Sequence, residues 1–287
     1  MKKERIEVKY YETYYFANIV NNILKNRFDY LRLLNEFYGD DNYNNFLEPF
    51  QKYSVFHQFI DFIIHSFYYE EIGKVNLNEQ RINKKRYFFI PEEANTDYDL
   101  LFIEEAFLYH SIDYTPFKEW LIENNKIFEN AVEDDVFEYY QELCLTGEMH
   151  ELVRQICEEV FFIMFINRNL LTLFNDMIAS IISEVKIKKI ETIEKKYFKN
   201  DGVLKRATIP EWVKRTIYYR DRGRCVLCNI DLSGIVTLQN YEEFDHIVPL
   251  SQGGINDISN MQLLCESCNR KKSGDKIITS NKYEKWY

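Results

Sequence analysis

Two Cys-x-x-Cys pairs in the last quarter of the chain constrain its folding more than any other feature. They are CVLC, with Cys225 and Cys228, and CESC, with Cys265 and Cys268. Two intervening residues let both sulfurs of a pair reach one ion at about 2.3 Å, so two pairs can complete a tetrahedral Zn²⁺ site. Because the protein would fill all four positions, we expect a structural site. The alternative is four buried thiols without a metal.

The residues around and between these pairs resemble a known family. From Ile209 to Gly274 the chain is similar to the HNH (ββα-metal) nucleases that carry an accessory zinc site. Three stretches follow the order and approximate spacing of that family: IPEWVKRTIYYRDRGRCVLC, DHIVPLSQGG and NMQLLCESCNRKKSG. The resemblance implies a small ββα-metal domain that cuts DNA and leaves a 3′-hydroxyl and a 5′-phosphate. It does not extend into residues 1–200.

Asp245 and His246 carry the chemistry that such a reaction needs. A neutral imidazole is well matched to accepting a proton near pH 7, so we expect His246 to be the general base that activates water. A carboxylate oxygen is a ligand that Mg²⁺ and Mn²⁺ prefer, so we expect Asp245 to bind the catalytic ion. The family resemblance implies that the pair lies at a strand end or a bulge, where both side chains can serve one site. The alternative is a solvated pair on a loop.

Two asparagines take their expected roles from the resemblance. Asn260 matches the central asparagine of the family, which holds the loop and orients the base histidine; a plain turn residue is the alternative. Asn269 matches the final position, where many members have a histidine metal ligand, and it resembles a variant with an Asp, Asn ligand pair. Without a metal, Asn269 could instead cap a helix. Gly253 and Gly254 would let the intervening loop turn sharply.

A cluster of cations in the same region is expected to contact nucleic-acid phosphates, although each could also lie on a solvated face. A helix beginning near Asn269 and ending at Gly274 would present its N-terminus to a phosphate. The six expected contacts are Arg220, Arg222, Arg224, Arg270, Lys271 and Lys272.

The charge along the chain is divided unevenly. Residues 195–287 contain 16 Lys/Arg against 11 Asp/Glu, whereas residues 1–194 contain 20 against 35. An acidic surface repels DNA and a basic one attracts it, so we expect the C-terminal part to meet the nucleic acid. DNA is the expected partner, with RNA as an alternative substrate. A zinc-stabilised binding module without catalytic activity is the other alternative.

Residues 1–203 are expected to form a large all-α domain, because only three glycines and three prolines interrupt residues 1–200. Apolar residues recur at helical spacing in residues 14–39 and 56–73, and from Glu148 to about Phe198 as one long helix or two abutting ones. The stretch KKRYFFIPEE could be a lone strand or an extended loop. The prediction is an α+β protein in which this domain precedes a small zinc-stabilised ββα-metal nuclease domain, residues 204–287. Asn200, Asp201 and Gly202 would end a helix at the junction, and Pro210 would start the next.

The remaining expectations concern location and partners. Six cysteines, four of them in the zinc pattern, are typical of a reducing compartment, and neither a signal peptide nor a membrane-spanning run is evident. We therefore expect a cytoplasmic protein without membrane contacts. The acidic helical domain would bind a partner protein, act as a sensor or join a second copy; its negative charge argues against the alternative that it reads the DNA target. Helical domains joined to such nucleases resemble effectors of bacterial defence against phage or plasmid DNA.

Overall fold

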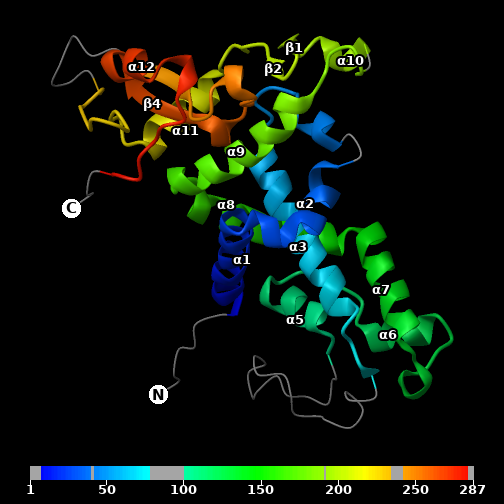
Figure 1. The fold of residues 1–287 in the computed structure, drawn as a ribbon. Helices are drawn as coiled ribbons and strands as arrows, with labels where there is room; N and C mark the ends of the chain where they lie inside the picture. Colours follow the sequence, from blue (N-terminus) through cyan, green and yellow to red (C-terminus); the bar gives the residue numbers. More distant parts are fainter. Residues whose placement is uncertain (1–7, 40–41, 78–99, 191, 234–241, 284–287) are drawn as a thin grey trace, which may run out of the picture. The chain divides into compact units, whose positions relative to one another are not determined.

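The structure, a computed structural model, describes residues 8–39, 42–77, 100–190, 192–233 and 242–283 (Figure 1). KKRYFFIPEE lies outside the described residues. The chain divides into two compact units. Unit 1 contains Met1–Asn18 and Ile60–Val160, and unit 2 contains Ile19–Phe59 and Phe161–Tyr287. Residue 203, near which the sequence predicts a domain boundary, falls inside unit 2.

Unit 1 is helical in its described part. Its helices include α5, α6, η4 and α7, together with parts of α1, α3 and α8 that continue into unit 2. Their bounds are α1 Val8–Lys25, α3 Val55–Ile72, α5 Phe102–Tyr109, α6 Phe117–Glu123, η4 Phe128–Asn130, α7 Glu133–Thr146 and α8 Glu148–Phe165. The buried Glu104 joins two of them, because its carboxylate accepts hydrogen bonds from Leu101 N at 2.6 Å and Phe117 N at 2.7 Å. Burial raises the pKa of Glu104 to about 7.

Unit 2 contains the remaining helices and all the strands of the described chain. Its elements before the C-terminal region are η1 Arg27–Tyr30, α2 Leu31–Tyr38, η2 Asn42–Phe46, α9 Arg168–Glu184, α10 Thr192–Lys195, β1 Phe198–Asn200 and β2 Val203–Leu204. The long pattern after Gly147 forms two helices, α8 and α9. Asn167 separates them and caps α9 by accepting a hydrogen bond from Leu170 N at 3.1 Å.

The expected helix up to Phe198 is wrong beyond Glu184, where α9 ends. Phe198 begins an antiparallel hairpin of β1 and β2, and Asp201 and Gly202 form its turn instead of ending a helix. Asn, Asp and Gly favour such a turn because they tolerate positive φ. Gly202 has a φ of 66°, and a Cβ there would lie 2.4 Å from Ser183 O of α9. The hairpin is therefore packed closely against α9.

In the C-terminal region of unit 2, helix α11 is followed by two strands and a helix in ββα order. The elements of this region are α11 Glu211–Arg220, β3 Glu242–His246, η5 Leu250–Gln252, η6 Ile258–Asn260, β4 Met261–Cys265, α12 Glu266–Lys272 and η7 Ser273–Asp275. β3 and β4 pair antiparallel, with Asp245 opposite Gln262 and His246 opposite Met261. The helix α12 begins at Glu266, with Cys265 as its cap, rather than near Asn269. The predicted α+β fold, helical before a small C-terminal region of strands and a helix, is confirmed.

Helix α9 packs directly on this ββα region within unit 2. Asn175 Nδ2 of α9 lies 3.3 Å from Ser259 Oγ, and a Cβ on Gly253 would lie 2.4 Å from Ala179 O. At the start of α3, Val55 N donates a hydrogen bond of 2.9 Å to the buried carboxylate of Asp257. The ββα region therefore shares a core with helices that precede it by up to 202 residues.

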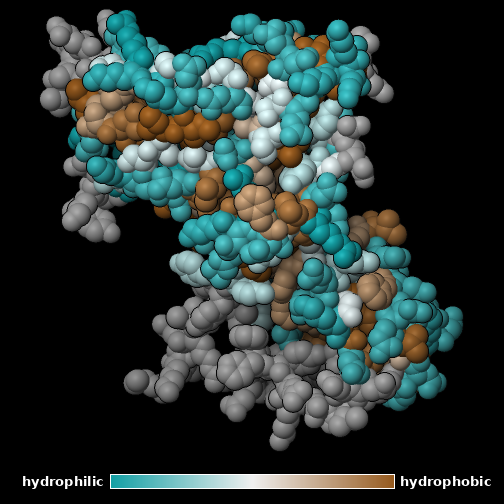
Figure 2. Space-filling view, viewed as in Figure 1, coloured by the Kyte–Doolittle hydropathy of each residue, from teal (hydrophilic) through white to brown (hydrophobic). Residues whose placement is uncertain are grey.

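The face in Figure 2 carries hydrophilic side chains over most of its described surface. A band of hydrophobic residues crosses the region of β4, and its borders are hydrophilic (Figures 1 and 2). None of the described helices combines the length and the hydropathy that crossing a bilayer requires.

Candidate active site and metal centre

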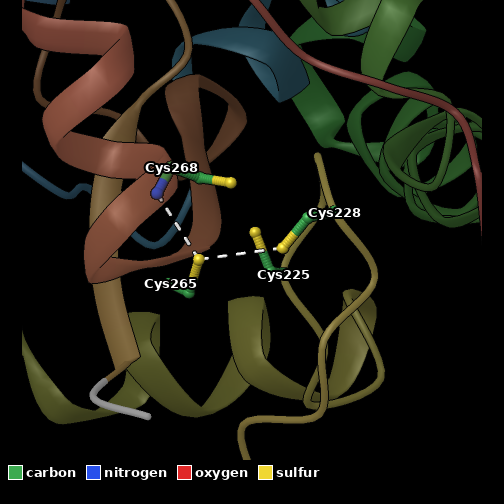
Figure 3. A group of neighbouring side chains, drawn as sticks. All are labelled: Cys225, Cys228, Cys265 and Cys268. Carbon is green, nitrogen blue, oxygen red and sulfur yellow. Dashed lines mark hydrogen bonds between the residues drawn. The ribbon is translucent and has the colours of Figure 1, made fainter.

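The four cysteines come together from two separate parts of unit 2. Cys225 and Cys228 lie in the loop after α11, Cys265 ends β4, and Cys268 lies in the first turn of α12 (Figure 3). Their four sulfur atoms all lie within 4.8 Å of one another. The Cys228 and Cys265 sulfurs are 3.7 Å apart, close to the edge of about 3.8 Å that a tetrahedron with Zn–S bonds of about 2.3 Å requires. The cysteines are thus arranged to bind a metal ion.

Backbone amides favour the thiolate of Cys225, whereas burial raises the pKa values of Cys228 and Cys268. Cys268 N donates to Cys265 Sγ at 3.4 Å, where the amides at the start of α12 point toward the cluster. Burial by itself raises the pKa of Cys225, but hydrogen bonds from the amides of Cys228, Cys265 and Leu227 outweigh it, so the pKa of this thiol is lowered. Thiolates are the form that binds metal, so the donor set fits a cation.

A pocket of about 470 Å³ lies beside the ββα elements, within unit 2. Three of the residues expected to carry the chemistry line it: Asp245 and His246 at the end of β3, and Asn269 in α12. Because Asp245 and His246 are the last two residues of β3, both can reach one pocket although they are neighbours. Arg270 also lines the pocket, whereas Asn260 does not.

His246 is held by a residue that the sequence did not single out. Its Nε2 lies 3.3 Å from Oδ1 of the buried Asn256. Asn256 Nδ2 donates to Lys205 O at 2.9 Å, so the amide is oriented with Oδ1 as the acceptor toward His246. In the tautomer that donates from Nε2, the lone pair is at Nδ1, which is buried and without a hydrogen-bond partner among the described residues. Burial, with smaller contributions from Arg206 and Lys272, lowers the pKa of His246 to about 4 and keeps the imidazole neutral.

Asp245 has one oxygen engaged and one available. Its Oδ2 lies 3.0 Å from Lys272 Nζ and accepts a hydrogen bond of 3.0 Å from Gln262 Nε2. Its Oδ1 accepts no hydrogen bond from the described part of the chain, and the side chain of Asn269 makes none there either. A carboxylate and an amide beside the same pocket are the oxygen donors that Mg²⁺ and Mn²⁺ favour. The residues present therefore fit a hard divalent cation.

Asn260 is fully buried and holds the loop that follows β3. Its Oδ1 accepts from Val248 N at 2.8 Å, and its Nδ2 donates to Val248 O at 3.0 Å and Ile255 O at 2.9 Å. Its main-chain oxygen accepts from Ile247 N at 2.7 Å. Its side chain is thus used on the loop, while Asn256 contacts the imidazole of His246.

Of the six cations expected to contact phosphates, two are exposed, two are half-buried and two are buried. Arg270 and Lys271 are exposed on α12. Arg222 and Arg224 are half-buried, with the Arg222 guanidinium 5.1 Å from the Tyr283 ring and Arg224 Nη1 donating to Asn229 O at 3.1 Å.

The other two cations are buried and are used inside the protein. Arg220 pairs with Asp221 at 2.8 Å and donates to Met261 O at 2.7 Å. Lys272 donates to His246 O at 2.7 Å, besides its contact with Asp245. Both side chains are buried, so Arg220 and Lys272 present no cation to a phosphate at the surface.

Helical spacing in the sequence could have indicated that Arg220 and Lys272 are buried. Arg220 follows the buried Val213 and Ile217 at intervals of four and three, and Lys272 lies four residues after Cys268, so each shares an inward face. For Asn256 the sequence offers no comparable signal, because the loop that places it has no regular period.

Comparisons with known proteins agree with this geometry. Residues 225–275 match the family model described as HNH endonuclease. The matched range contains all four cysteines together with Asp245, His246, Asn260 and Asn269, so the resemblance inferred from the motifs is confirmed. No curated protein and no solved structure matches the chain.

Proposed function

We propose, on the premise that residues 225–275 form an HNH endonuclease domain, that the protein is a metal-dependent nuclease that hydrolyses phosphodiester bonds of DNA. The observation that carries the proposal is the pocket lined by Asp245, His246 and Asn269 at the junction of β3 and α12. A general base and two oxygen donors for a hard cation lie beside a cavity large enough for a phosphodiester group.

In this reaction His246 accepts a proton from the attacking water. Asn256 orients the imidazole through Nε2, which leaves the lone pair on the buried Nδ1, an atom without a hydrogen-bond partner among the described residues, as the proton acceptor. Asp245 and Asn269 would hold Mg²⁺ or Mn²⁺, which supplies charge stabilisation at the phosphate and at the leaving oxygen. Lys272 and Gln262 hold Asp245 in place through Oδ2, while Asn260 fixes the loop between β3 and η5.

Zn²⁺ is the proposed occupant of the four-cysteine site, where it would be structural. The set of four thiolates suits a soft or borderline ion and leaves no open position for a substrate. By joining the loop after α11 to the β4–α12 junction, the ion would fix the helix that carries Asn269.

DNA is the proposed substrate, and RNA and binding without cleavage are the alternatives. The basic charge of the C-terminal part supports a polyanionic substrate. Asp245, His246 and Asn269 line one pocket, which supports catalysis over a binding module that has lost its activity. We further propose a cytoplasmic location, because a four-thiolate zinc site suits a reducing compartment. We propose that residues 204–287 carry the nuclease function and that residues 1–203 form a separate functional part.

We further propose that the acidic residues 1–203 bind a protein partner or a second copy and restrain the nuclease, as in an effector of defence against phage or plasmid DNA. What supports this is the excess of 35 Asp/Glu over 20 Lys/Arg in residues 1–194. An activity that contacts DNA through phosphates alone needs restraint in its own cell, since it does not discriminate between sequences.

The test is cleavage of plasmid DNA and of a structured RNA of similar length by the purified full chain. Mg²⁺ and Mn²⁺ are each added to metal-free buffer, with excess chelator as the control. Cleavage of DNA that depends on either ion supports the proposal. Cleavage of RNA alone favours the RNA alternative, and binding to DNA without cleavage in any metal favours the inactive module.

A further inference from the structure

The positive charge of the C-terminal part is concentrated just before the matched HNH region. Residues 186–206 contain eight Lys/Arg and three Asp/Glu, whereas residues 207–287 contain eleven and ten. All eight cations of the first segment are exposed, while two of the ten that the structure describes in the second are buried, Arg220 and Lys272. The basic surface of this part is therefore supplied mainly by the segment that carries α10 and the β1–β2 hairpin.

The hairpin places two of these cations at the candidate active site. Lys199 in β1 and Arg206 after β2 line the same pocket as Asp245 and His246. In Figure 1 the hairpin lies beside the ββα elements, within unit 2. One wall of the pocket is thus built by residues outside the range that matches the HNH family model.

This wall is fixed in position from two sides. Gly202 in the hairpin turn packs against the main chain of Ser183 in α9. On the other side, Asn256 donates to Lys205 O at 2.9 Å and accepts from Ala207 N at 3.3 Å, so it holds the residues on both sides of Arg206. The same Asn256 oxygen contacts His246. One buried amide therefore contacts both the base and the two residues that flank Arg206.

No partner among the described residues explains the position of these two cations. Neither the Lys199 ammonium nor the Arg206 guanidinium forms a hydrogen bond or an ion pair within the described parts of the chain. The carboxylate of Asp245, in the same pocket, already has Lys272 Nζ at 3.0 Å. The pocket therefore has an excess of positive charge on its hairpin side, which favours an anionic ligand.

We propose that Lys199 and Arg206 bind the phosphates of the nucleic-acid backbone next to the scissile bond. This site rests on the proposed function and adds to it a phosphate-binding wall outside the HNH motif. A guanidinium binds a phosphate through two parallel hydrogen bonds and an ammonium binds it as a point charge, so the pair would position the backbone without reading its sequence.

The test measures binding of a 30-base-pair duplex across a range of salt concentrations. All proteins carry His246→Ala so that the duplex stays intact. In that background, Lys199→Gln, Arg206→Gln and the double variant are compared with a matched double control, Lys214→Gln with Arg215→Gln. These control cations lie on α11 beside Glu211 and do not line the pocket. Removing one phosphate contact lowers the slope of log K against log salt by about 0.9, so the pocket double variant should lose about 1.8.

Two further measurements make the outcome decisive. The charge-conserving pair Lys199→Arg and Arg206→Lys should restore most of the binding and the salt slope, which a merely structural effect would not do. Cleavage by the chain with His246 intact is measured separately, so that loss of the proposed function is recognised independently of the binding result. A pocket double variant that binds and responds to salt like the α11 double control overturns the proposal.

Discussion

Replacing Arg168 by methionine should destabilise the C-terminal elements although the residue lies 57 positions before Cys225. The Arg168 side chain is 1% exposed. Its Nη1 donates to Asp221 Oδ1 at 2.7 Å and its Nη2 to Lys282 O at 2.7 Å, while Nε donates to Ser280 O. The guanidinium also lies 3.9 Å from the ring of Tyr283. One side chain of α9 therefore holds α11 and the C-terminal segment together.

The expected loss in the free energy of unfolding depends on which buried charges remain paired after each substitution. Breaking a buried ion pair by removing one partner costs about 3–5 kcal/mol. Arg168→Met leaves Asp221 paired with Arg220 at 2.8 Å, so we expect about 3 kcal/mol. Asp221→Ala leaves two buried guanidiniums without a carboxylate and removes the acceptor of Leu263 N, so we expect about 5 kcal/mol.

The assay is reversible unfolding by urea, followed by thermal unfolding of the same variants. A loss of 1 kcal/mol shifts Tm by about 2–4 °C in a unit of 150–250 residues, so Arg168→Met should lower it by about 6–12 °C. The control is Arg215→Met, whose side chain is 73% exposed and pairs with Glu211, with an expected cost below about 1 kcal/mol. The reasoning is refuted if Arg168→Met costs no more than this control, or if Asp221→Ala costs less than Arg168→Met.

Three other predictions concern the zinc site, the loop and the extent of the folding unit. Cys228→Ser should lower the bound zinc measured by elemental analysis and lower Tm, whereas Cys144→Ser, an exposed cysteine outside the cluster, should change neither; equal zinc content in both would contradict the site. Gly253→Ala should cost about 1–3 kcal/mol, because φ is 84° and the added Cβ would lie 2.4 Å from Ala179 O. Its control is Gly274→Ala, where the nearest atom is 3.6 Å away, and equal Tm values would show that the loop can move. A fragment of residues 204–287 lacks α9 and should be digested by protease faster than a fragment of residues 161–287; equal resistance would mean that the packing on α9 contributes little.

The four-cysteine cluster could be predicted because the two cysteines of each pair are close in sequence, whereas the ββα order was implied by the resemblance to the HNH nucleases. Each Cys-x-x-Cys pair has a spacing that chelation by itself requires. Asp245 and His246 are adjacent in the sequence. They are the last two residues of β3, and at a strand end both side chains can reach one site. The helical nature of the earlier residues followed from periodicity in the same way.

The contacts that position the site could not be predicted, because they join residues far apart in the sequence. Arg168 meets Asp221 over 53 residues, and Asn256 meets Lys205 over 51. No local pattern encodes such pairs. The hairpin of residues 198–204 was missed for another reason: its strands are only two and three residues long, too short for an alternating pattern to emerge from the helical one before it.

The role of His246 is tested by the rate of plasmid cleavage by His246→Ala at saturating Mg²⁺ or Mn²⁺, with DNA affinity measured on the same preparation. If His246 is the general base, the rate should fall by at least about 10²-fold while affinity stays close to that of the unsubstituted chain. Asn256→Ala removes the contact to Nε2 but leaves the imidazole of His246 in place, so the cleavage rate should fall by a smaller factor. Cleavage by His246→Ala at the rate of the unsubstituted chain would contradict the assignment of the base and the active site built around it.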